Sequence, residues 1–127
     1  MSIEKAIYKR KFDFNSNDIR TVAGFINPST KNPIKIKKVR VINVHKESHL
    51  GNHWREYDEF YGIIGNAEFI LEDIKTKKRK IYFMETGDSL YIPKEVALKV
   101  IANGGTIIIV CSEELKREEG THAYDFE

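Results

Sequence analysis

The chain has 127 residues, with 21 lysines and arginines against 19 aspartates and glutamates, which gives a net charge of +2. This length fits a single domain, and the small net charge excludes a strongly basic nucleic-acid-binding protein. The longest apolar run, Ile107–Cys111, is far shorter than the roughly 20 residues of a membrane span. The charged N-terminal segment does not resemble a signal peptide. We therefore expect a cytoplasmic protein with no nucleic-acid partner and no membrane association.

Short apolar runs separated by turn residues predict β-strands through most of the chain. Ile19–Ile26 is strand-like but irregular. Alternation over Ile36–Val44 predicts a strand with Arg40, Ile42 and Val44 on one face. Further strands are expected at Phe60–Ile64, Ala67–Leu71, Lys80–Met84, Ser89–Ile92, Ala97–Ile101 and Thr106–Cys111.

Two further signals lie near the C-terminus. Asn103-Gly104-Gly105 predicts a hairpin turn, and Glu113–Glu119 predicts a short helix between Ser112 as its N-cap and Gly120 as its stop. The many short strands indicate one β-sandwich or barrel domain over residues 1–127. We divide it into an N-terminal extension (1–35), a barrel (36–111) and a C-terminal tail (112–127).

Two segments, Gly51–Gly65 and Gly87–Leu98, carry motif-like spacing. The first contains His53-Trp54-Arg55 followed by Glu59, and in the second Gly87 precedes Tyr91-Ile92-Pro93. These segments resemble the two motifs of the cupin superfamily, in which HxH is followed by a glutamate and a glycine, and a second glycine is followed by a proline and a histidine. The resemblance implies an all-β fold, a single-domain, mostly antiparallel cupin-type β-barrel or jelly roll.

The resemblance also identifies the positions that bind a metal in other cupins. They are His53, Arg55, Glu59 (or Asp58 with a one-residue deletion) and Leu98. An arginine is always charged and offers no lone pair, and leucine has no donor atom. We therefore expect no metal and no cofactor.

Three other histidines, His45, His49 and His122, remain candidates for the site. His45 and His49 fit exposed loop residues better than they fit members of the site. His122 lies close to the C-terminus, where order is difficult to anticipate from sequence.

Within the cupins, the chain is similar to sugar-nucleotide 3,4-ketoisomerases. Ile36–Ile42 resembles their IKRVYYI stretch, Leu50–Arg55 resembles RGxHxHK, and Tyr124-Asp125-Phe126 resembles their aromatic tail. Capsular-polysaccharide cupin domains have a similar Gly-Asn-His stretch. This resemblance implies metal-independent tautomerisation of a nucleotide-linked hexose, with one histidine of the usual pair present as His53 and the second replaced by Arg55.

The candidate catalytic residues are therefore His53, Glu59 and Tyr61. An imidazole has a pKa near neutrality and suits a general base. Glu59 or Tyr61 would be the second proton carrier.

Arg55, Tyr91 and Leu98 are the candidate substrate-binding residues. Arg55 would bind an anion or stabilise an enolate oxygen; the alternative is an internal ion pair with Asp58 or Glu59. Tyr91, like Tyr61, fits a sugar pocket or the hydrophobic core.

The leading functional hypothesis is a sugar-nucleotide isomerase or epimerase of deoxysugar or polysaccharide biosynthesis, with a small nucleotide-linked sugar as its ligand. The alternative is a non-catalytic ligand-binding cupin, and a metal-dependent cupin enzyme is a third possibility. Because the edges of a small barrel need covering, we also expect a homodimer in which Ile19–Ile26 pairs with or packs on the other subunit.

Overall fold

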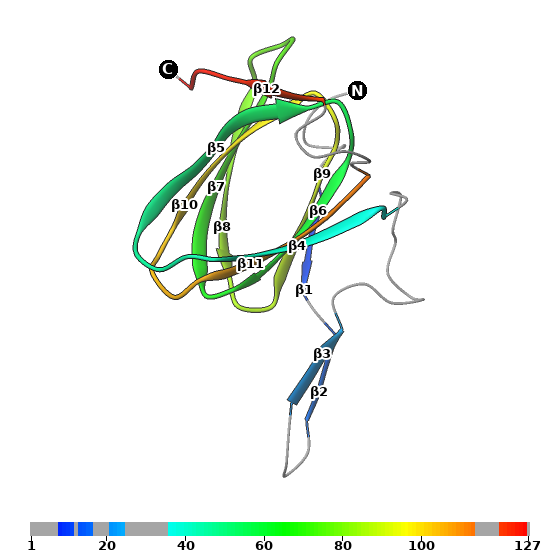
Figure 1. The fold of residues 1–127 in the computed structure, drawn as a ribbon, viewed down its shortest axis with the longest axis vertical. Helices are drawn as coiled ribbons and strands as arrows, with labels where there is room; N and C mark the ends of the chain where they lie inside the picture. Colours follow the sequence, from blue (N-terminus) through cyan, green and yellow to red (C-terminus); the bar gives the residue numbers. More distant parts are fainter. Residues whose placement is uncertain (1–7, 12, 17–20, 25–35, 114–119, 127) are drawn as a thin grey trace.

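The computed structural model describes residues 8–11, 13–16, 21–24, 36–113 and 120–126. In this part of the chain all regular structure is β. Two five-stranded antiparallel sheets pack face to face, and a third sheet of two strands forms a separate hairpin (Figure 1). No helix in the described part of the chain is long and apolar enough to span a membrane.

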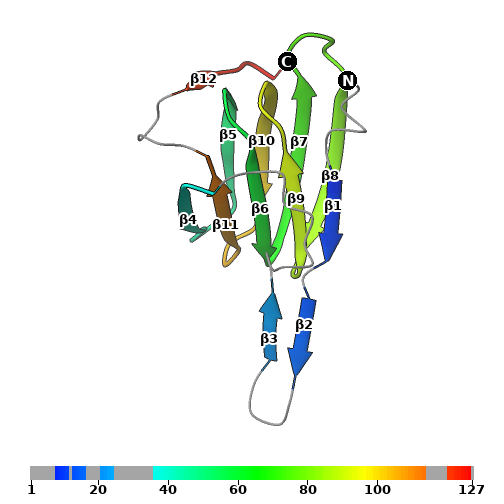
Figure 2. The same cartoon turned by 90° about the vertical axis from the view of Figure 1, so that its right-hand side faces the viewer.

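The two large sheets have the strand orders of a jelly roll. The first sheet contains β1 (Tyr8–Lys11), β9 (Asp88–Ile92), β6 (Glu59–Ile64), β11 (Ile107–Ser112) and β4 (Lys38–Asn43), in this order. The second sheet contains β12 (Thr121–Ala123), β5 (Ser48–Arg55), β10 (Val96–Ala102), β7 (Asn66–Asp73) and β8 (Arg79–Glu85). The hairpin contains β2 (Asp13–Ser16) and β3 (Thr21–Gly24) and extends away from both sheets in both views (Figures 1 and 2).

The hydrophobic core lies between the inner faces of the two sheets. Successive side chains of a strand point to opposite faces, so every second residue of β6, β7, β10 and β11 contributes to it. Tyr61 of β6 and Phe69 of β7 meet edge to face across the core, with ring centroids 5.5 Å apart. Burial of each large apolar side chain contributes about 1.5–3 kcal/mol, so the packed core holds the two sheets together.

At the side of the sandwich where β1 and β8 form the sheet edges, two lysines of β1 contact neighbouring strands. Lys9 of β1 donates to the carbonyl oxygen of Phe83 in β8 at 3.2 Å, and Lys11 Nζ lies 2.7 Å from the buried carboxylate of Asp88. The first contact links the edge strands β1 and β8 of the two sheets, whereas the second lies within the first sheet, between β1 and β9. On the other side, β4 and β12 are the edge strands (Figure 2).

The all-β jelly-roll prediction is confirmed, although the described strands form two sheets rather than one continuously hydrogen-bonded barrel. Every strand predicted from Ile36 onward exists, with no end shifted by more than two residues. β3 falls within Ile19–Ile26, whose remaining residues lie outside the described ones. Strands β1, β2, β5 and β12 were not among the predicted strands.

The predicted helix at Glu113–Glu119 falls mostly outside the described residues, and Glu113 itself is not helical. The division of the domain into three segments and the cytoplasmic location remain predictions.

Candidate functional site

The irregular strand β5 places His53 and Arg55 on the inner face of the second sheet. Gly51 and Asn52 have φ values of +90° and +60°, and the β5–β10 register shifts between Leu98 and Lys99. After this bulge, His53 lies directly opposite Leu98. A Cβ on Gly51 would meet the Leu98 carbonyl oxygen at 2.6 Å, so the close strand approach requires glycine.

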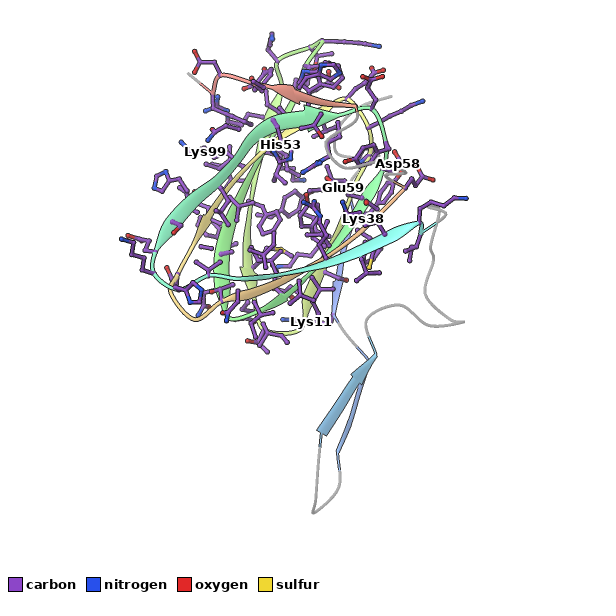
Figure 3. The ribbon with its side chains drawn as sticks, in the orientation of Figure 1. Lys11, Lys38, His53, Asp58, Glu59 and Lys99 are labelled. Atoms are coloured by element: carbon purple, nitrogen blue, oxygen red, sulfur yellow. The ribbon has the colours of Figure 1, made fainter. Side chains whose placement is uncertain are left out.

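The first sheet supplies the facing residues. Glu59 and Tyr61 are two residues apart on β6 and therefore share its inner face. Val110 of β11 lies opposite Tyr61 on one side and Arg40 of β4 on the other, so Arg40 occupies the same inner row. Figure 3 shows Glu59 and His53 at the same end of the sandwich, on strands of different sheets.

Arg55 is the central residue of a polar cluster, which consists of Arg40, His53, Arg55, Tyr57, Glu59, Tyr61 and Thr121. Its Nε atom donates to His53 Nε2 at 3.1 Å and also lies 3.2 Å from Glu59 Oε1, with which it forms an ion pair. Its Nη1 atom donates to the hydroxyls of Tyr57 at 2.7 Å and Thr121 at 2.9 Å. Arg55 therefore connects both sheets and the C-terminal strand β12.

Glu59 is the acidic centre of the cluster. Its side chain is only 4 % exposed, and its second oxygen, Oε2, lies 3.6 Å from Arg40 Nη2. Tyr61 donates its hydroxyl to Glu59 Oε1 at 2.8 Å. Two guanidinium groups therefore face one carboxylate, and with a neutral His53 the cluster carries an excess of one positive charge.

The pKa values of two groups reflect this environment. Burial, followed by the positive charge of Arg55, lowers the pKa of His53 from 6.5 to about 4, although a hydrogen bond with the Gly51 backbone acts in the opposite direction. Burial and the adjacent Glu59 carboxylate raise the pKa of Tyr61 well above 10. At neutral pH, His53 is therefore an uncharged imidazole and Tyr61 a protonated phenol.

The structure brings together five of the six residues singled out by sequence. His53, Arg55, Glu59, Tyr61 and Leu98 all lie on the inner faces at one end of the sandwich.

The sixth residue, Tyr91, lies opposite Phe60 on the outer face of the first sheet and packs against the Phe60–Cys111 cluster there, apart from His53. Asp58, the alternative acidic residue, accepts a hydrogen bond from the Lys94 backbone at 2.8 Å instead of pairing with Arg55. Of the open alternatives for Arg55, the ion pair with Glu59 is therefore present.

The other histidines lie away from the cluster. His45 and His49 are exposed, and His122 stacks on Trp54 with ring centroids 4.2 Å apart. In residues 36–113 and 120–126, no group of three or more histidine, cysteine, aspartate or glutamate side chains is arranged to hold a metal ion.

A cavity of about 280 Å³ opens at the opposite end of the second sheet. Its lining includes Glu68, Phe83, Ile101 and Asn103, and it shares no residue with the cluster. We place the candidate site at the cluster because the polar and titratable groups converge there.

Three members of the cluster were missed by sequence reasoning. Arg40 had a signal, because it interrupts the apolar face that it shares with Ile42 and Val44. Tyr57 and Thr121 had none, because Thr121 reaches Arg55 only through β12 pairing with β5, across 66 residues of sequence.

No family model matches the chain, and no curated protein matches it in sequence. Solved structures do match. The sugar 3,4-ketoisomerase QdtA from Thermoanaerobacterium thermosaccharolyticum, in complex with TDP, is 20 % identical, with a TM-score of 0.76 over 91 % of this chain and 86 % of that one.

The TDP-fucose-3,4-ketoisomerase WlaRA from Campylobacter jejuni is 22 % identical, with a TM-score of 0.70 over 94 % of this chain and 89 % of that one. The RmlC epimerase of Mycobacterium tuberculosis reaches a TM-score of 0.81 at 7 % identity, over 97 % of this chain and 70 % of that one. The chain therefore has the RmlC-like cupin fold. Its structural neighbours are sugar-nucleotide ketoisomerases and epimerases.

Proposed function

We propose that the protein binds a nucleotide-linked sugar between its two sheets, beside Arg55, and transfers a proton on that sugar without a metal. The observation that carries the proposal is the convergence of His53, Arg55, Glu59 and Tyr61 from both sheets on one interior cluster. The similarity to sugar-nucleotide ketoisomerases and epimerases supports the same class of substrate.

His53 is the proposed general base. Its Nε2 atom accepts the Arg55 N–H, so the ring is neutral and carries its proton on Nδ1. A substrate that takes over the Arg55 contact would expose the Nε2 lone pair next to the reacting carbon. Tyr61 stays protonated and donates its single O–H to Glu59 Oε1, and it would redirect this O–H to a sugar oxygen when the substrate binds.

Arg55 is the proposed stabiliser of the enolate oxygen that forms when a proton leaves the carbon next to a keto group. A fixed positive charge aimed at developing negative charge is worth a few kcal/mol in a water-poor site. The same charge opposes metal binding. At an effective dielectric of about 20, a +1 and a +2 charge 4 Å apart repel by roughly 8 kcal/mol, and Leu98 opposite His53 supplies no ligand atom.

The test is solvent-deuterium incorporation into TDP-4-keto-6-deoxyglucose, followed by mass spectrometry, with untagged protein and with chelator present. We expect exchange that survives chelation and is lost in His53→Asn, while calorimetry shows that the variant still binds the sugar nucleotide. Exchange that needs an added metal would refute the metal-independent mechanism, and absence of both binding and exchange would refute the proposed function.

A second candidate function is a non-catalytic sugar-nucleotide-binding cupin. The specific observation in its favour is that the only lone pair of His53 suited to proton abstraction already accepts a hydrogen bond from Arg55. Binding of the sugar nucleotide without any deuterium exchange would select this alternative.

The homodimer remains part of the proposal. The β2–β3 hairpin forms a two-stranded sheet separate from the two main sheets, and an isolated two-stranded hairpin is marginally stable in water. Packing on a second copy would cover it.

A further inference from the structure

The cluster contains more positive than negative charge. Arg55 Nε lies 3.2 Å from one oxygen of Glu59, and Arg40 Nη2 lies 3.6 Å from the other. Among the described residues, neither arginine has a second carboxylate within ion-pair distance. Within the described residues, two guanidinium groups therefore share one carboxylate, and a buried charge without a counter-charge is costly.

Both arginines also have unused N–H groups. The contacts of Arg55 engage Nε and Nη1 and leave the two N–H groups of Nη2 without a protein acceptor in the described part of the chain. Arg40 has a buried Nε that likewise finds no acceptor there. The Arg40 side chain is 33 % exposed whereas that of Arg55 is 10 % exposed, so an anion would enter past Arg40.

The position of Arg55 indicates which group of a sugar nucleotide would be the anion that the two arginines bind. Its guanidinium lies within hydrogen-bond distance of His53 Nε2, the proposed proton carrier. An anion bound by Arg55 therefore lies next to the reacting carbons, which in ketoisomerases of this fold are C3 and C4 of the hexose, as the name 3,4-ketoisomerase states. The nearer phosphorus of the diphosphate, attached through the oxygen on C1, lies four bonds from C3, whereas the carbon of a carboxylate at C6 lies only two bonds from C4.

We propose that Arg55 and Arg40 together recognise a carboxylate on the sugar, so that the ligand is a nucleotide-linked uronate. This inference rests on the proposed function, because it specifies the sugar bound at the same site. A carboxylate is planar and accepts two parallel N–H bonds from a guanidinium. It would also supply the missing negative charge.

A carboxylate ligand would explain why Arg55 stands where the HxH motif has its second histidine. In a site for a neutral keto sugar, an arginine beside the base could stabilise the enolate oxygen, but the bound substrate would offer it no anion to pair with. In a site for a uronate, the same arginine anchors the substrate, and its movement toward the substrate carboxylate would release the His53 lone pair.

The test compares two probes that differ only at C6, TDP-glucose and TDP-glucuronate, with TDP alone as the third. Isothermal titration calorimetry would measure each with the full-length protein and with Arg55→Gln, Arg40→Gln and Lys99→Gln. Lys99 follows Leu98 on β10 and points to the outer face of the second sheet (Figure 3), so its variant removes one positive charge nearby without touching the cluster.

We expect the unchanged protein to bind TDP-glucuronate at least tenfold more tightly than TDP-glucose. Arg55→Gln and Arg40→Gln should reduce this preference to threefold or less and leave TDP binding within threefold, and Lys99→Gln should preserve the preference. Thermal denaturation would establish that each variant is folded. Should Arg55→Gln fail to fold, Arg55→Lys, which keeps the charge but loses the bidentate geometry, replaces it.

The outcomes are distinct. Equal affinity for the two sugars in the unchanged protein would overturn the uronate inference and leave the proposed function standing. Weakening of TDP itself by Arg55→Gln, to the same extent as TDP-glucuronate, would assign the arginines to the diphosphate and also overturn it. Failure of all three probes to bind would refute the proposed function.

Discussion

Arg55 donates its Nε–H to the Nε2 lone pair of His53, two residues earlier on the same face of β5, at 3.1 Å. A general base needs this lone pair free. Arg55 Nε also lies 3.2 Å from Glu59 Oε1 in an ion pair, so the guanidinium is held by the carboxylate as well as by the imidazole. This contact holds His53 in the tautomer that carries its proton on Nδ1, and in the proposed reaction Arg55 would have to move before His53 could act as the base.

The first prediction concerns the titration of His53. Its pKa is about 4, mainly because of burial and then because of Arg55, so the ring should titrate near pH 4 in imidazole-detected ¹⁵N NMR. Arg55→Gln removes the cation but not the burial, so the pKa should rise while staying below 6.5. An unchanged pKa in Arg55→Gln would contradict the electrostatic role of Arg55.

The same shift predicts a pH dependence of stability. Between pH 6.5 and about 4, the unfolded chain binds a proton at His53 that the folded chain does not. The free energy of unfolding should therefore fall as the pH drops through this window. The upper limit is about 3 kcal/mol, and solvent screening of the partly exposed ring lowers it. Urea denaturation of His53→Asn across this pH range should show a correspondingly flatter profile.

The second prediction concerns Glu59, which neutralises part of the charge of two arginines while only 3 % exposed. Glu59→Gln leaves both cations without a counter-charge, and breaking a buried pair in this way costs about 3–5 kcal/mol. Urea denaturation at pH 7 measures the loss.

The matched control is Glu85→Gln. The Glu85 side chain is 71 % exposed and pairs with Lys11 at the surface, where an ion pair is worth at most about 1 kcal/mol. Equal losses in the two variants would show that the Glu59 pairs contribute no more than a surface ion pair.

The sequence predicts the part of this site whose residues lie close together along the chain. His53, Arg55 and Glu59 belong to one continuous motif, and strand alternation alone puts His53 and Arg55 on a common face. Leu98 comes from the second motif and indeed lies opposite His53.

The missing parts depend on long-range strand pairing. Thr121 contacts Arg55 because the three-residue strand β12 pairs with β5, and a strand that short has no detectable period in sequence. Tyr91, a candidate substrate-binding residue, lies instead on the outer face of the first sheet, and strand alternation explains why. Its neighbours Leu90 and Ile92 are buried in the core between the sheets, and the period of two turns Tyr91 to the outer face.

The third prediction tests the β5–β10 bulge that places His53 opposite Leu98. Gly51→Ala adds a Cβ 2.6 Å from the Leu98 carbonyl oxygen at a φ of +90°, so it should destabilise the protein by about 1–2 kcal/mol for the backbone conformation, plus the cost of the clash. Gly105→Ala has a similar φ of +86° but nothing within 4 Å, and it measures the conformational cost alone. Thermal denaturation of both variants should show the larger loss in Gly51→Ala, and equal losses would contradict the close approach of β5 and β10.

The fourth prediction is a homodimer. Light scattering at micromolar concentration should give twice the chain mass of 14.8 kDa. Replacing residues 13–24 with a short glycine-serine linker removes the hairpin and leaves β1 in place, and it should shift the mass toward the monomer. A monomeric unchanged protein would refute the dimer, and a dimer that survives removal of the hairpin would place the interface elsewhere.

The last prediction restores the second histidine. Arg55→His replaces the guanidinium with an imidazole two residues after His53, on the same inner face, and so recreates the HxH pattern of the sugar-nucleotide ketoisomerases. The change removes the N–H that occupies the His53 lone pair, and it supplies a second group that titrates near neutrality. General acid–base catalysis by a positioned side chain is worth on the order of 10²–10⁴ in rate. We therefore expect at least a tenfold faster deuterium exchange into TDP-4-keto-6-deoxyglucose than in the unchanged protein, and a weaker preference for TDP-glucuronate.

Because the substitution also breaks the Glu59 ion pair, its stability must be measured in parallel, with Arg55→Gln as the control that breaks the pair without adding an imidazole. Exchange in Arg55→His no faster than in Arg55→Gln, with both variants folded, would show that the inner face of β5 does not carry the proton transfer.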